Sequence, residues 1–260
     1  SSDLATWWAR VQGEWLQMGN VSSCFEGFKP PQRPKGKLVL KYFDIAGRAE
    51  PIRLALALGE YTFQDVRLRG EEWGEKEKES APFKQLPVLY IDGVPLAQTK
   101  AILRYLGRVT QFQGKSLYPT DPYVSAKVDE IMDAFDDLWI LLAPTYRIQN
   151  QAQKEQARQR LFEEGEAKGL IQIFESTLAK STNGYVIAEA GFSVADLMYF
   201  AFLSMVRSGF VEGLGPKLLS GYPHILRHKE LVAAMPEVQK YYKKQNNAGC
   251  PFYEVFLPGN

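Results

Sequence analysis

Residues 37–109 combine strand and helix patterns in an order that strongly restricts the fold. Two apolar strand patterns flank a helix pattern; a second pair of strand patterns, joined by the hairpin signal Asp92-Gly93, precedes another helix pattern. In order, the segments are KLVLKYF (37–43), RAEPIRLALALGE (48–60), YTFQDVRL (61–68), PVLYID (87–92), VPLAQ (94–98) and TKAILRYLGRV (99–109). A strand-helix-strand unit needs a crossover connection, so its strands are parallel, whereas a hairpin makes the other two antiparallel.

This order predicts a thioredoxin-like domain over residues 37–109, with a mixed four-stranded sheet and helices on both faces. Residues 110–122, TQFQGKSLYPTDP, are expected to be a linker. Beyond them every long segment has the 3.6-residue period of a helix, which predicts an all-helical domain over residues 123–245. The apolar tail at 246–260 is expected to cover another surface.

Residues 1–36 form an N-terminal extension with its own pattern. Leu4, Trp8, Val11, Trp15 and Met18 share one helical stripe, and a proline-rich linker follows. An amphipathic helix with so large an apolar face is expected to dock on protein, either on the rest of its own chain or on a partner. A membrane surface is disfavoured because the charge is nearly balanced, whereas interfacial helices are usually rich in Lys and Arg.

Charge and cysteine content exclude several function classes. With 31 basic and 30 acidic residues the chain has no net field to attract nucleic acid or anionic lipid, so a small ligand or a protein partner is expected. Only two cysteines occur, Cys24 and Cys250, near opposite ends of the sequence and without a CxxC, and this low cysteine content favours a reducing, cytoplasmic compartment. Because the sequence does not begin with Met, an organelle is the alternative if a leader was removed. His224 and His228 share a helix face without a third ligand, so no metal site is expected.

Tyr42 stands at the carboxyl end of the first strand, the edge where open α/β sheets bind ligands. Tyr42-Phe43-Asp44-Ile45 occupies the place where thioredoxin-like redox proteins carry their dithiol. A phenol there can donate a hydrogen bond to a nucleophile; the alternative is a tyrosine packed under the turn.

Two further segments point to the same groove. Pro87 in KQLPVL is expected to follow a cis peptide bond that leaves the main chain of Leu86 free to pair with an extended peptide; the alternative is an ordinary strand-starting proline. Gln98 and Thr99 begin a helix and could face a carboxylate, or Thr99 could be a plain N-cap. Together these features predict a site for a small acidic thiol peptide.

The motifs YFDIAGRAEPIRLAL, EEWGEKEKESAPFKQLPVLYIDG and LAQTKAILRYLG, followed by VDEIMDAFDDLW and GFSVADLMYF, resemble those of a cytosolic glutathione S-transferase, closest to the sigma class. The resemblance covers residues 37 to about 245. It implies a homodimeric detoxification enzyme that uses glutathione as co-substrate. In GFSVADLMYF, the spacing of Ser193 and Asp196 predicts a helix capping box, which is structural.

The resemblance also implies a role for each matching residue. Tyr42 would stabilise the glutathione thiolate, with Arg48 as a nearby cation. The remaining glutathione contacts would be Trp73 and Lys76 or Lys78 at the glycine end, Gln85, Leu86 and Pro87 at the cysteinyl backbone, Gln98 and Thr99 at the γ-glutamyl carboxylate, and Asp137 from the partner subunit.

The reaction expected from this resemblance is thiolate attack on an electrophile or a thiol-assisted isomerisation. An apolar electrophile pocket is predicted between the domains, bounded by Phe43, Ile45, Trp139, Leu142 and Tyr146, with the tail around Phe252 and Phe256 as a further wall. The alternative function is a non-catalytic structural or assembly subunit that docks through residues 1–34.

Overall fold

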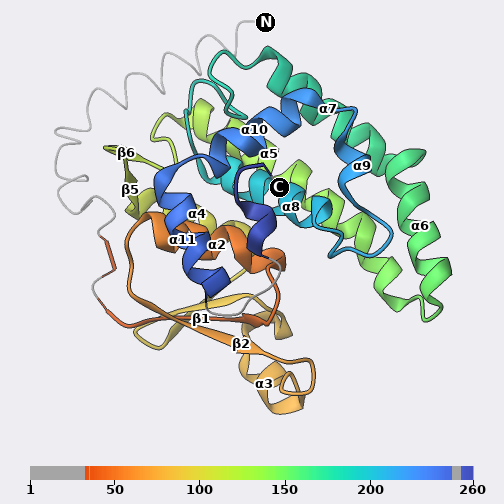
Figure 1. The fold of residues 1–260 in the computed structure, drawn as a ribbon. Helices are drawn as coiled ribbons and strands as arrows, with labels where there is room; N and C mark the ends of the chain where they lie inside the picture. The colour runs from red at the N-terminus through yellow and green to blue at the C-terminus, as the bar shows by residue number, and fades with distance from the viewer. Residues whose placement is uncertain (1–32, 35, 248–252, 260) are drawn as a thin grey trace, which may run out of the picture. The chain divides into compact units, whose positions relative to one another are not determined.

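The computed structural model describes residues 33–34, 36–247 and 253–259 (Figure 1). The predicted N-terminal helix, Cys24, Cys250 and Phe252 lie outside these residues. The strands are β1 (Leu38–Phe43), β2 (Phe63–Leu68), β3 (Val88–Ile91), β4 (Val94–Ala97), β5 (Gln111–Phe112) and β6 (Lys115–Ser116). The helices are α2 (Glu50–Leu58), α3 (Glu75–Ser80), α4 (Thr99–Val109), α5 (Pro122–Leu142), α6 (Gln151–Glu163), α7 (Glu166–Lys180), α8 (Val194–Arg207), α9 (Pro216–Leu219), α10 (Pro223–Ala233) and α11 (Pro236–Asn247). Short 3-10 segments are Gly47–Ala49, Pro82–Lys84, Ala143–Arg147 and Tyr253–Phe256.

The first lobe is built on a four-stranded sheet of order β2-β1-β3-β4. β1 pairs parallel with β2 and antiparallel with β3, and β3 pairs antiparallel with β4. α2 and α4 lie on one side of the sheet and α3 on the other (Figure 1). The predicted thioredoxin-like fold is therefore confirmed. Along β1, Leu38, Leu40 and Tyr42 alternate onto the buried face, which sets the direction of the Tyr42 ring.

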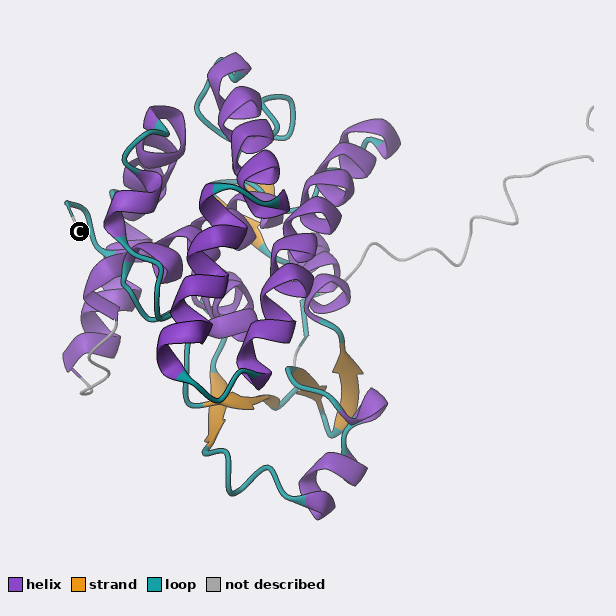
Figure 2. Cartoon of the chain, turned by 90° about the vertical axis from the view of Figure 1, so that its right-hand side faces the viewer, coloured by secondary structure: helices purple, strands orange, loops and turns teal. Residues whose placement is uncertain are grey.

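The second lobe is the predicted helical domain, and its bundle stands over the sheet in Figure 2. α8 is its central helix, since every residue from Val194 to Val206 is buried. The capping box is present: one oxygen of Asp196 accepts a hydrogen bond from the Ser193 N–H at 2.9 Å. The other oxygen accepts from the Val186 N–H at 2.8 Å and bonds His228 Nε2 at 2.9 Å. One carboxylate thus joins three segments of the lobe.

Residues 110–122 are more ordered than a simple linker. β5 and β6 form a small hairpin whose turn, Gln113-Gly114, has φ of 49° and 78°. Strands of two residues are too short to show alternation in a sequence, which is why the pattern does not reveal them.

The C-terminal segment packs into the core. The ring of Phe256 stacks on Tyr242 of α11 at 4.6 Å and contacts Phe200 of α8 at 5.8 Å. The expectation that Phe256 walls a pocket near Trp139 is therefore wrong, because its apolar ring is already covered by α8 and α11. Within the described ranges no helix is long and apolar enough to span a membrane.

Candidate active site

The hydroxyl of Tyr42 is held by the turn that follows β1. The backbone N–H of Arg48 donates a hydrogen bond to the Tyr42 oxygen at 3.1 Å. Because the oxygen acts as acceptor in this bond, its own proton remains available for another acceptor. Burial raises the pKa of the Tyr42 phenol, although the Arg48 N–H and the charges of Arg48 and Arg53 oppose the rise. The Tyr42 phenol therefore keeps its proton at physiological pH.

Gly47 makes this arrangement sterically feasible. Its φ of +46° lies in the left-handed region, and a Cβ at this position would lie 2.6 Å from the Tyr42 oxygen. Glycine is therefore required at this position, because any Cβ would collide with the Tyr42 hydroxyl.

The guanidinium of Arg48 lies between the lobes. It forms an ion pair with Asp136 of α5 and lies 5.3 Å from the centre of the Trp139 ring. Lys100 also contacts Asp136, at 3.4 Å. The positive charge beside Tyr42 is thus tied to the helical lobe.

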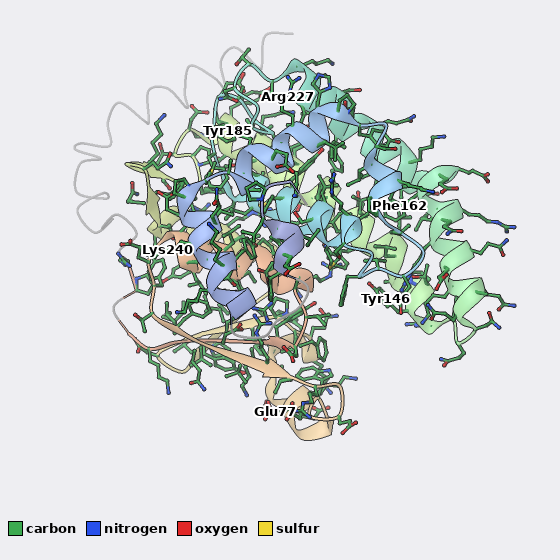
Figure 3. All side chains as sticks on the ribbon, in the orientation of Figure 1. Glu77, Tyr146, Phe162, Tyr185, Arg227 and Lys240 are labelled. Atoms are coloured by element: carbon green, nitrogen blue, oxygen red, sulfur yellow. The ribbon has the colours of Figure 1, made fainter. Side chains whose placement is uncertain are left out.

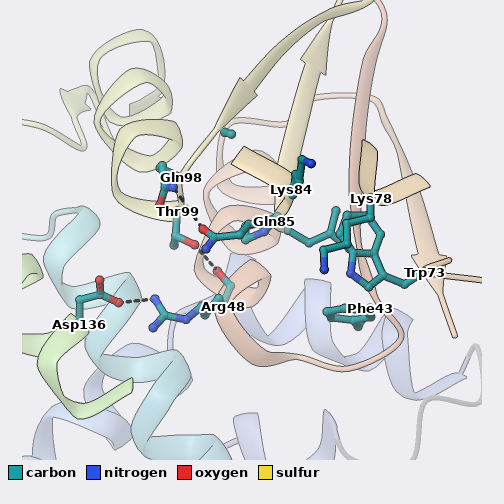
Figure 4. Close-up of a pocket in the computed structure, with 12 residues that line it drawn as sticks. Phe43, Arg48, Trp73, Lys78, Lys84, Gln85, Gln98, Thr99 and Asp136 are labelled. Carbon is teal, nitrogen blue, oxygen red and sulfur yellow. Dashed lines mark hydrogen bonds and ion pairs between the residues drawn. The ribbon is translucent and has the colours of Figure 1, made fainter. Parts of the chain in front are cut away.

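A cavity of about 460 Å³ opens beside this turn (Figure 4). It brings together residues from both lobes that are far apart in the sequence. Its lining residues are Phe43, Arg48, Trp73, Lys78, Lys84, Gln85, Leu86, Pro87, Ala97, Gln98, Thr99 and Asp136. Nine of the predicted site residues are in this set. Tyr42 lies under the turn that contributes Arg48.

One wall of the cavity is extended main chain. The Leu86-Pro87 peptide bond is cis, as the sequence predicts, and Gln85 has extended backbone angles of −139° and 156°. Within the described part of the chain, no other main-chain group bonds the N–H or C=O of Leu86. These two groups are therefore free to pair with the backbone of a peptide ligand.

The start of α4 forms the adjoining wall. Gln98 occupies the N-cap position with φ of 72°, and its side-chain amide lies 3.4 Å from that of Gln85. Thr99 is the first helical residue, and its hydroxyl donates to the Arg48 carbonyl oxygen at 3.3 Å. The plain N-cap alternative for Thr99 is therefore wrong. The free N–H groups at this helix start favour an anion.

Trp73 and Lys78 lie at the opposite end of the cavity, where Trp73 packs edge-on against Phe43 at 6.0 Å between ring centres. Of the two lysines predicted for this end, Lys78 lines the cavity; the side chain of Lys76 lies outside what the structure describes. Lys84, which sequence reasoning missed, also lines it. Lys84 directly precedes the predicted Gln85, and this neighbouring position could have identified it as a candidate site residue.

Asp136 and Ala97 are further lining residues that sequence reasoning missed. Asp136 faces Arg48 and Lys100, whereas Asp137 is exposed and does not line this cavity. Successive residues of a helix point about 100° apart, so only one of the two aspartates can face Arg48 of the first lobe. The predicted contact of Asp137 with a second subunit stays a prediction.

Of the five residues predicted for an electrophile pocket, Phe43 lines this cavity, whereas Ile45, Trp139, Leu142 and Tyr146 do not. Trp139 is half-buried under Arg48, and Ile45 is half-buried in the turn. Tyr146 is half exposed, beside α6 in Figure 3, and its ring lies 4.7 Å from the Arg158 guanidinium. Leu142 is fully buried, so it can support such a pocket only from behind.

The two histidines are paired with different carboxylates. His224 Nδ1 lies 2.7 Å from Glu175, and His228 bonds Asp196. Among the residues that the structure describes, no group of three or more His, Cys, Asp or Glu side chains could hold a metal ion.

Comparison with known proteins gives consistent matches over both lobes. Residues 38–108 match the model for the glutathione S-transferase N-terminal domain, and residues 136–245 the model for the C-terminal domain. Glutathione S-transferase 1 of Ascaris suum is 35% identical over 205 residues, which cover 78% of this chain and 93% of that protein. Hematopoietic prostaglandin D synthase of Gallus gallus is 30% identical over 206 residues, 79% of this chain and 95% of its own. The crystal structure of the Ascaris lumbricoides glutathione S-transferase superposes with a TM-score of 0.64 at 32% identity, covering 80% of this chain and 97% of that one.

Proposed function

Because the chain belongs to the glutathione S-transferase family, and is an enzyme of glutathione conjugation or isomerisation, we propose that Tyr42 donates the hydrogen bond that stabilises the glutathione thiolate. The observation that carries this proposal is the 3.1 Å hydrogen bond from the Arg48 N–H to the Tyr42 oxygen. It orients the phenol and leaves its proton free. The pKa of Tyr42, raised by burial, keeps that proton on the oxygen at neutral pH.

Glutathione would lie along the cavity in one direction. Its γ-glutamyl carboxylate would meet Gln98 and Thr99 at the start of α4, its cysteinyl backbone would pair with Leu86, and its glycine end would reach Trp73 and Lys78. The support for this orientation is a helix start at one end, unpaired main chain in the middle and a lysine at the other end. These three recognition elements match the three residues of the peptide in order.

Thiolate formation needs a moderate amount of stabilisation. A free thiol has a pKa of about 8.5, and lowering it by about 2 units corresponds to about 2.7 kcal/mol. A phenol donor together with the nearby Arg48 cation can supply this amount. The ion pair of Arg48 with Asp136 fixes the cation and moderates its charge.

For the second substrate we propose an apolar electrophile bound beside Phe43, Ile45, Trp139 and Tyr146. Assignment to the sigma class is part of the proposal; its support is the Tyr42-Phe43 pair and the similarity to a prostaglandin D synthase. A cytoplasmic location is likewise proposed, from the cysteine content.

We further propose a homodimer in which Asp137 of one subunit completes the glutathione site of the other. The support is that Asp137 is exposed beside the site, and that both lobes carry exposed apolar side chains, Phe83 and Val94 on the first and Tyr123 and Ile140 on the second. Such side chains are typical of a surface that contacts another copy.

The test is the Tyr42→Phe variant, compared with Tyr61→Phe. Tyr61 is a buried tyrosine of the same lobe whose hydroxyl donates to the Val109 carbonyl at 3.1 Å, away from the cavity. Tyr42→Phe is expected to bind immobilised glutathione and to lose about 10- to 1000-fold in kcat/KM, with the bound thiol ionising at higher pH. Tyr61→Phe is expected to retain activity. If Tyr42→Phe keeps both activity and thiol ionisation, Tyr42 is not the donor.

A further inference from the structure

The turn that carries the site is held from behind by one buried arginine. Arg53 of α2 has no exposed surface, and its guanidinium donates to the carbonyl oxygens of Ile45 at 2.8 Å and Ala46 at 3.3 Å. It also lies 5.8 Å from the centre of the Tyr42 ring. The geometry of residues 43–46, and with it the position of the Tyr42 hydroxyl, depends on where this guanidinium sits.

Two carboxylates fix Arg53 in turn. Glu50 accepts from its Nη1 at 3.1 Å, and Asp65 of β2 accepts from its Nε at 3.0 Å. Glu50 is completely buried, and burial raises the pKa of its carboxyl while Arg53 and Arg67 oppose the rise. A buried carboxylate in this situation depends on its hydrogen-bond donors.

One of these donors comes from the end of the chain. The hydroxyl of Tyr253 donates to Glu50 Oε2 at 3.0 Å and accepts from Arg67 Nη2 at 2.9 Å. Tyr253 lies in the C-terminal 3-10 segment, 203 residues beyond Glu50. The groups that face Glu50 are Arg53 from α2, Arg67 from β2, Tyr241 and Tyr242 from α11, and Tyr253, whereas Asp65 of β2 faces Arg53.

We propose that Tyr253 is a positioning residue for the transferase reaction, acting through Glu50 and Arg53 to fix the turn that holds the Tyr42 hydroxyl. This inference rests on the proposed role of Tyr42. The Tyr253 ring has a separate packing role, since it stacks on Tyr242 at 5.8 Å and adjoins Phe256 at 5.7 Å. Replacing Tyr253 with Phe therefore removes the hydroxyl and leaves the packing in place.

The experiment measures kcat/KM against pH for the full chain, Tyr253→Phe, Tyr61→Phe and Tyr42→Phe. A weakened thiolate site needs higher pH to ionise the thiol, so Tyr253→Phe is expected to lose about 3- to 10-fold in kcat/KM on the acid side and to recover at high pH. Tyr61→Phe is the matched control, because its hydroxyl also donates one hydrogen bond, to Val109, and accepts one, from Thr110 at 3.4 Å. The melting temperature of Tyr61→Phe should fall by about as much as that of Tyr253→Phe. The acid limb of its pH profile, where kcat/KM falls as pH is lowered, should stay unchanged.

A second comparison tests whether Tyr253 acts through Glu50. In a Glu50→Gln background, Tyr253→Phe should have little further effect on the acid limb, because both changes act on the same contact. An unchanged acid limb in Tyr253→Phe, or an effect of undiminished size in the Glu50→Gln background, would overturn the inference. If Tyr42→Phe itself leaves the acid limb in place, the proposed role of Tyr42 fails instead, so the two failures are distinguishable.

Discussion

Replacing Gly47 with Ala should damage the site in a way that the structure lets us estimate. The added Cβ would lie 2.6 Å from the Tyr42 oxygen and 2.9 Å from Cε1 of the same ring. An ordinary contact begins at 3.4 Å, so the oxygen must withdraw by about 0.8 Å. The backbone N–H of Arg48, the next residue, bonds this oxygen, so the turn and the phenol would shift together.

Two terms contribute to the loss of stability. Placing a Cβ on a left-handed backbone costs about 1–2 kcal/mol, offset by about 0.4–1 kcal/mol from the stiffer unfolded chain. Overpacking against Tyr42 adds about 1–3 kcal/mol, for a total of about 1–4.5 kcal/mol. A misplacement of nearly 1 Å in a catalytic group can lower the rate by about 100-fold, so we expect kcat/KM to fall by about 30- to 100-fold.

Gly93→Ala is the matched control. Gly93 also has a positive φ, of 83°, but a Cβ there meets nothing within 4 Å. Denaturant unfolding should show a loss of about 0–1.5 kcal/mol for Gly93→Ala, with kcat/KM unchanged. If Gly47→Ala behaves like Gly93→Ala in both measurements, the close approach of the turn to Tyr42 does not control the site.

Three further changes test other parts of the structure. Glu175 accepts from the N–H groups of His224 and Ile225 at the start of α10; burial raises its pKa, but these bonds outweigh burial and leave the pKa lowered. Glu175→Gln should therefore cost about 1–2 kcal/mol at pH 7, a difference that shrinks as pH falls below 4.5 and through the folded-state pKa; a constant difference in unfolding free energy would argue against this role. Asp137→Asn should raise KM for glutathione about 3- to 10-fold, and an unchanged KM would remove Asp137 from the site. Deleting residues 1–32 should leave glutathione affinity, measured by calorimetry, within a few-fold of the full chain, because the described cavity lining starts at Phe43; loss of binding by a folded product would show that the extension builds the site.

The sequence alone was sufficient for features that depend on local order. Alternation and helical periodicity identified the strands and helices, and Tyr42 at a strand end, Pro87 before a strand and Thr99 at a helix start were each visible within a few residues. The capping box at Ser193 and Asp196 is local for the same reason, since both partners lie within one helical turn. These elements were enough to predict the fold and the cavity residues Leu86, Pro87, Gln98 and Thr99, whereas Trp73, Lys78 and Gln85 were implied by the resemblance to glutathione S-transferases.

Tertiary packing decided the contacts between distant segments. Which aspartate of the Asp136-Asp137 pair faces Arg48 depends on the rotation of α5 against the first lobe, and a sequence does not specify that rotation. The contact between Tyr253 and Glu50 joins residues 203 positions apart, and Glu175 completes the start of a helix 49 residues away. Such polar contacts have no periodic pattern, because each arises where the folded chain leaves a buried charge or a free N–H in need of a partner.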